Sequence, residues 1–155
     1  GSAWLEASST SGGLLLSSRT FNDDPDGTYG QYVPAVAMAD LVGAGETVVL
    51  AGMTSSDGFR TNLGIASAAD VPTTVTLRVT AQDGSLAGEL DVTVPPQSLV
   101  QLDRVLTASF GYTGRAWATL SSDDPETAFS AYASVVDEGT GDPVFIPAVR
   151  IATGR

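Results

Sequence analysis

The sequence predicts an all-β protein, an antiparallel β-sandwich of about ten strands. Short apolar runs alternate with polar residues at a period of two, and the 17 glycines and 8 prolines fall between these runs. A chain of 155 residues can bury a core of its own and is expected to form one domain. It contains no cysteine, so this core forms without disulfides.

The chain also contains an internal duplication, because residues 1–36 align without gaps with residues 114–149 at a constant offset of 113 positions. The ten identical pairs are Gly1/Gly114, Ala3/Ala116, Trp4/Trp117, Ser8/Ser121, Ser9/Ser122, Ser17/Ser130, Asp24/Asp137, Pro34/Pro147, Ala35/Ala148 and Val36/Val149. Either a module of 113 residues recurs in tandem, or both copies pack into one sandwich around central strands 47–106. An isolated hairpin is marginal in water, so we favour one domain over residues 1–155, and a monomer.

The N-terminal copy is expected to supply three strands. Residues 3–8 alternate, and a Ser-Gly-Gly turn leads into residues 14–21, which predicts a first hairpin. Residues 22–27, Asn-Asp-Asp-Pro-Asp-Gly, are typical of a tight polar turn, and residues 28–33 predict the third strand. Residues 35–46 predict a crossover with at most one helical turn, since Gly43 and Gly45 interrupt any helix.

The rest of the chain continues strand after strand. Residues 73–81 and 86–94 have the clearest alternation, and Gln-Asp-Gly-Ser between them predicts a hairpin turn. Residues 107–114 predict a loop that carries Phe110 and Tyr112. The remaining strands are expected over residues 47–51, 59–65, 98–106, 116–121, 128–136 and 144–149.

Charge and composition exclude several functions. The seven cationic residues are all arginines, spread singly along a chain of net charge −11, whereas nucleic acids and anionic membranes need clustered positive charge. No apolar run reaches the length of a membrane span. Serine nucleophiles need a base, and His, Lys and Cys are absent. We therefore expect no enzyme, no catalytic residue, no nucleic-acid partner and no membrane insertion.

One turn resembles the front of a calcium loop. Asn22, Asp24 and Asp26 alternate before Gly27, and oxygen ligands at such spacing can wrap a cation. However, Val33 stands where the loop would need a bidentate glutamate, and the flanks predict strands. A plain polar turn is the preferred interpretation, with calcium as the one candidate cofactor.

The two tryptophans are candidate ligand residues. Trp4 and Trp117 could stack on sugar rings, with Tyr29, Tyr32, Tyr112 and Tyr132 as helpers. Aromatic side chains also dominate cores, and both tryptophans recur at one position of the duplication. Packing in the core or at a sheet end is therefore the favoured interpretation.

Three phrases carry a resemblance to a family: Ser-Arg-Thr-Phe-Asn at 18–22, Gly-Thr-Tyr-Gly-Gln at 27–31 and Phe-Arg-Thr-Asn-Leu-Gly at 59–64. With them the chain resembles uncharacterised Ig-like or jelly-roll β-sandwich modules of large secreted or surface proteins from high-GC bacteria. The resemblance implies a non-catalytic structural, adhesive or assembly module, extracellular or at the cell surface, with protein or self-assembly partners. The alternative is a carbohydrate-binding accessory module of a secreted hydrolase, whose partner would be a polysaccharide.

Overall fold

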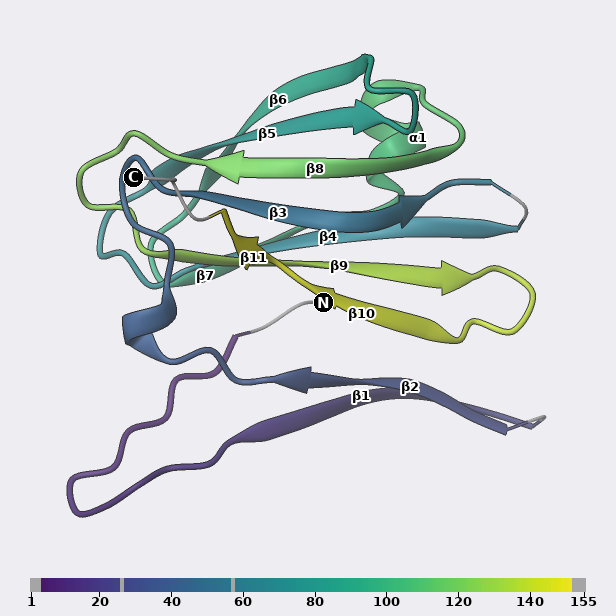
Figure 1. Cartoon of the computed structure of the whole chain (residues 1–155). Coiled ribbons are helices and arrows are strands. Elements are labelled where there is room, and N and C mark those ends of the chain that lie inside the picture. The colour runs from purple at the N-terminus through teal and green to yellow at the C-terminus, as the bar shows by residue number, and fades with distance from the viewer. Residues whose placement is uncertain (1–3, 26, 57, 152–155) are drawn as a thin grey trace.

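The computed structural model describes residues 4–25, 27–56 and 58–151. It confirms the fold class, since 54% of the residues lie in strands and 6% in helices, and its 11 strands form antiparallel sheets. The sandwich consists of a four-stranded sheet in the order β10-β9-β4-β7 and a five-stranded sheet in the order β11-β3-β8-β5-β6 (Figure 1). The strands of these two sheets are β3 (Thr47–Thr54), β4 (Phe59–Ser67), β5 (Thr73–Ala81), β6 (Leu86–Val94), β7 (Ser98–Leu102), β8 (Arg115–Ser121), β9 (Phe129–Asp137), β10 (Pro143–Pro147) and β11 (Val149–Arg150).

The core lies between the two sheets and follows the predicted alternation. On β5, Val75, Leu77 and Val79 are fully buried, whereas Thr74 and Arg78 face outward. A strand presents successive side chains to opposite faces, so a period of two produces one apolar and one polar face. The largest fully buried side chains are Phe129, Leu50, Met53, Leu63, Ile65, Leu77, Leu106 and Leu120, with Val48, Val75, Val79 and Val94.

The N-terminal copy forms a hairpin outside both sheets. Strands β1 (Ser17–Asp24) and β2 (Gly27–Pro34) pair from Ser17↔Pro34 to Asp24↔Gly27 as a separate two-stranded sheet. The predicted hairpin of residues 3–8 with 14–21 is wrong, because the described residues 4–16 form neither strand nor helix. Residues 17–24 pair instead across a shorter turn, so most of the predicted polar turn 22–27 is strand.

The hairpin lies against the four-stranded sheet. Strand β2 runs beside β10 (Figure 1). The Ser134 hydroxyl of β9 donates a hydrogen bond to Gln31 Oε1 at 3.0 Å. Gln31 and Val33 are partly buried, while Phe21 and Tyr32 face solvent. The duplication in the sequence predicts that both copies supply strands to one sandwich. In the structure the sandwich strands lie between Thr47 and Arg150.

Two short helices occur among the described residues. The 3-10 turn η1 (Met38–Asp40) confirms the single helical turn expected in the crossover. Helix α1 (Val105–Phe110) was missed, since residues 98–106 were expected as strand and 107–114 as loop. Its Val105 and Leu106 are fully buried, and Gly111 ends it with a left-handed φ of 61°. No helix in the described part of the chain is long and apolar enough to cross a membrane.

The predicted last strand, 144–149, is divided between the two sheets. Strand β10 pairs with β9 up to Pro147↔Tyr132, and β11 then pairs with β3 through Val149↔Val49 and Arg150↔Val48. Pro147 has no N–H to donate, which favours the end of the ladder at this point. The Ile151 N–H donates to the Thr47 carbonyl at 3.0 Å, so the chain leaves the sandwich beside the start of β3.

Candidate functional site

The candidate site is the part of the outer face of the four-stranded sheet, opposite the core, that lies around Gly64 and Tyr132. Farther along β9 the hairpin packs on the same face through the Ser134–Gln31 bond. On β4, Leu63 and Ile65 point into the core, so Arg60, Asn62 and Gly64 face outward. Gly64 pairs with Tyr132 on β9 and with Gln101 on β7. The register therefore gathers polar and aromatic side chains from three strands on one face.

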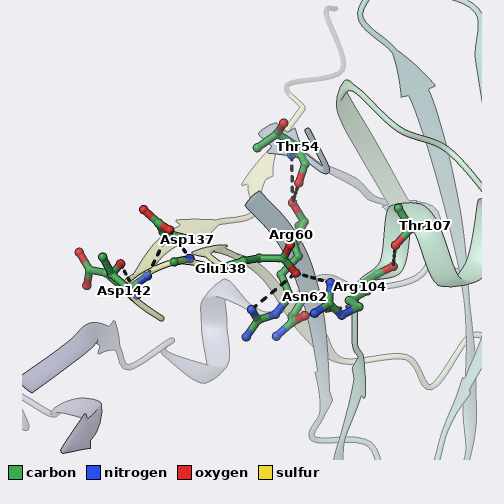
Figure 2. Close-up of polar contacts among 11 residues, drawn as sticks. Thr54, Arg60, Asn62, Arg104, Thr107, Asp137, Glu138 and Asp142 are labelled. Carbon is green, nitrogen blue, oxygen red and sulfur yellow. Dashed lines mark hydrogen bonds and ion pairs between the residues drawn. The ribbon is translucent and has the colours of Figure 1, made fainter. Parts of the chain in front are cut away.

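A charged network occupies one end of this face (Figure 2). The Glu138 carboxylate lies between two arginines: Arg60 Nη1 is 4.0 Å from Oε1, and Arg104 Nη1 donates to the same oxygen. The Arg60, Glu138 and Arg104 side chains remain 29%, 36% and 54% exposed. At such exposure each ion pair contributes less than about 1 kcal/mol to stability.

Arg104 adopts an unusual backbone conformation. Its φ of 50° and ψ of 42° lie in the left-handed region, which residues other than glycine rarely adopt. Its backbone N–H donates to Asn62 Oδ1 at 3.0 Å, and its carbonyl accepts a bond from the Thr107 hydroxyl at 3.3 Å (Figure 2). Arg60, Asn62, Asp103 and Arg104 line a shallow depression of about 340 Å³.

Tyr132 lies on the same face, paired with Gly64, which is two residues along β4 from Asn62. A Cβ atom added at Gly64 would come within 2.3 Å of Tyr132 Cε1, so the ring covers the glycine. The ring stacks on Phe145 with centroids 5.4 Å apart, and its hydroxyl donates to Gln101 Oε1 at 3.4 Å. Partial burial raises the pKa of Tyr132, and the Asp103 carboxylate raises it further. Tyr132 is therefore a neutral hydrogen-bonding ring at physiological pH.

The arrangement offers recognition chemistry. An aromatic ring, two guanidinium groups and the amides of Asn62 and Gln101 can stack on a ligand and exchange hydrogen bonds with it. The described residues provide no histidine, lysine or cysteine that could activate a nucleophile here.

The predicted calcium residues fall mostly outside what the structure describes. Asn22 and Asp24 belong to β1, but their side chains lie outside the described part, and so does Asp26 as a whole. At the neighbouring position, Asp23 Oδ1 accepts a long hydrogen bond of 3.5 Å from the Thr28 hydroxyl. Among the residues that the structure describes, no three acidic side chains lie close enough to hold a metal ion.

The two tryptophans belong to different segments. Trp117 lies on β8 opposite Thr80, on the outer face of the five-stranded sheet, and is 40% exposed. Of the expected packing in the core or at a sheet end, the structure excludes the core for Trp117, because its neighbours Ala116 and Ala118 take the inward positions. Trp4 is half-buried in the irregular stretch before β1. Trp117 thus lies on the other sheet from Tyr132, which the sequence suggested only as a helper.

A second notable surface is the N-terminal segment, defined as residues 4–34. Leu5 is 79% exposed, Leu15 98%, Phe21 65% and Tyr32 59%. Scattered apolar side chains are ordinary on protein surfaces, but several in one short segment indicate a contact surface.

The sequence alone does not point to a site formed by Asn62, Gln101, Asp103, Arg104 and Glu138. The available signal was the outward alternation of Arg60 and Asn62 on one strand and of Tyr132 on another. Their meeting depends on the pairing of β4 with β9 and β7, which are far apart in sequence. Comparison of the chain with protein-family models, with curated proteins and with solved structures found no match.

Proposed function

We propose that this protein is a non-catalytic β-sandwich module of an extracellular assembly, and that the N-terminal segment joins it to other modules. The observation that carries the proposal is the exposure of Leu5, Leu15, Phe21 and Tyr32 on a segment that repeats part of the sandwich. Covering such apolar surface with a partner removes it from water, which lowers the free energy and favours binding.

The charge of the chain supports the same proposal. With a net charge of −11, chains repel one another in general, so association must come from a specific apolar surface. The monomer expectation rested on packing both copies into one sandwich. Because β1 and β2 form a separate sheet, Phe21 and Tyr32 on them remain open to a partner.

We expect the full chain to self-associate as its concentration rises, and residues 37–155 alone to remain monomeric. The shorter chain retains the strands of both sheets, from Thr47 to Arg150, so it is expected to unfold cooperatively at a temperature near that of the full chain. Sedimentation velocity over a concentration series measures the association, and calorimetry measures the unfolding. A full chain that is monomeric at every concentration would contradict the assembly role.

A second candidate function is carbohydrate binding at the outer face of the four-stranded sheet. The specific observation is the Tyr132 ring, which covers Gly64 and lies beside the polar side chains of Asn62 and Gln101. A ring held flat on a sheet can stack on the apolar face of a sugar, and the flanking amides can bond its hydroxyl groups.

If this second function is correct, Tyr132→Ala abolishes retention on the polysaccharide that binds the protein, and Trp117→Ala retains it. Affinity electrophoresis in gels containing neutral and acidic polysaccharides measures the retention, and calorimetric melting checks that both variants fold. Loss of retention on Trp117→Ala alone would instead support the tryptophan that the sequence suggested.

A further inference from the structure

We infer that residues 4–34 are the last strands of a second sandwich, and that their partner is a polypeptide equivalent to residues 37–113. This inference rests on the proposed function and names its partner. Residues 37–113, from here on called the framework, contain β3 to β7 and helix α1.

The buried positions of the C-terminal copy have apolar counterparts in the N-terminal copy. In the C-terminal copy, Ala118, Leu120 and Phe129 are fully buried. Subtracting the offset of 113 gives Leu5, Ala7 and Leu16, which are apolar as well. Leu5 and Ala7 are exposed, and Leu16 is only partly buried. The N-terminal copy therefore has the apolar pattern of a core segment, but these side chains are not packed in a core.

The strands of the two copies correspond only in part. Shifted by 113, β9 and β10 become residues 16–24 and 30–34, which overlap β1 and the second part of β2. The pairing differs by two residues, because Pro147↔Tyr132 shifts to Pro34↔Arg19, whereas Pro34 pairs with Ser17. Shifted likewise, β8 becomes residues 2–8, and the described part of that stretch forms no strand. The β9–β10 hairpin thus has a counterpart in the N-terminal copy, namely β1–β2, whereas β8 has no counterpart in the described part of that copy.

The sheet order explains this difference. Strand β9 pairs with β10 inside its own copy, so the equivalent hairpin can form by itself. Strand β8 lies between β3 and β5, and both of these belong to the framework. The chain has one framework and two copies that need it. Residues 4–8 stay irregular because the strands that would flank them are already paired with β8.

The partner follows from the same pairing. Ala118 pairs with Leu50 of β3 and with Val79 of β5, and all three side chains are fully buried. Leu5 would take this place between the equivalents of Leu50 and Val79. The resident framework is occupied by β8 and β9, so the partner is a second framework of the same kind.

The test supplies that framework. In a chain with residues 37–113 placed directly before Gly1, we expect two sandwiches in place of one. Amide exchange at residues 4–8 and 17–24 should slow by roughly 100-fold or more relative to the natural chain, because these amides would join stable sheets. Hydrogen exchange read by mass spectrometry measures this, and calorimetry should show about twice the unfolding enthalpy, which scales with the number of folded residues.

Leu5→Asp provides the matched control. In the natural chain this exposed side chain should tolerate the change without a shift in melting temperature. In the extended chain it should abolish the new protection and leave the C-terminal sandwich intact, since a charge would enter the new core. Three results would overturn the inference. The extended chain could be soluble but leave residues 4–24 unprotected, it could be insoluble, or Leu5→Asp could leave the new protection unchanged.

The outcome is separable from that of the proposed function. Suppose that the natural chain self-associates but residues 4–24 of the extended chain stay unprotected. This pair of results would support the assembly role and contradict a second framework as the partner.

Discussion

Phe129→Ala is expected to lower the free energy of unfolding by about 3–5 kcal/mol, the usual cost of deleting a fully buried phenyl ring. Phe129 is fully buried at the start of β9, and its backbone N–H and carbonyl bond to Val42 of the crossover. The substitution would remove the largest side chain of the core and the packing that holds the crossover to the sandwich.

Leu16→Ala is the matched control, because Leu16 occupies the equivalent position in the N-terminal copy. This side chain is only partly buried, so its truncation should cost less than about 1 kcal/mol. Urea denaturation followed by circular dichroism gives both free energies on the same scale. Equal losses at the two positions would mean that the N-terminal copy packs into the core after all, as the sequence analysis expected.

Gly64→Ala is expected to destabilise the protein by about 1–3 kcal/mol through overpacking. The new methyl group would lie 2.3 Å from Tyr132 Cε1 and 2.4 Å from Cζ, so the ring would have to leave the sheet and its contact with Phe145. Alanine otherwise suits a strand better than glycine, by about 0.5–1 kcal/mol.

The same substitution should be neutral or stabilising in a Tyr132→Ala background, because the ring that causes the clash is gone. The coupling between the two positions, measured as a double-mutant cycle by chemical denaturation, should therefore be at least about 1 kcal/mol. Additive effects would show that the ring moves away from Gly64 without cost and is not a fixed part of the outer face.

The strands that the sequence predicted most closely are those whose pairing is local. Residues 73–81 and 86–94 match β5 and β6 at both ends, since alternation and a short polar turn suffice to define a hairpin. Residues 3–8 have an equally regular alternation and form no strand over their described part. Alternation shows which face of a strand is apolar, but a strand also needs neighbours, and one sequence does not reveal which neighbours are free.

The missed helix and the missed site have different causes. Helix α1 has six residues, too few for a helical period to appear, and buried Val105 and Leu106 fit a strand pattern equally well. The outer face depends on long-range pairing that sets Tyr132 beside Gly64 and Gln101. Each residue had an ordinary surface interpretation by itself, and only the register brings them together.

The position of β11 has a mechanical consequence. Ile151 bonds to Thr47, so the chain enters and leaves the sandwich at the same end, on two antiparallel neighbours. A force pulling these two ends apart acts on one β11–β3 hydrogen bond at a time, as in opening a zipper, and never on the whole ladder at once. If modules were joined through these points, both attachment points of each sandwich would lie at the same end. Tension between them would separate β11 from β3 before it acted on the core strands.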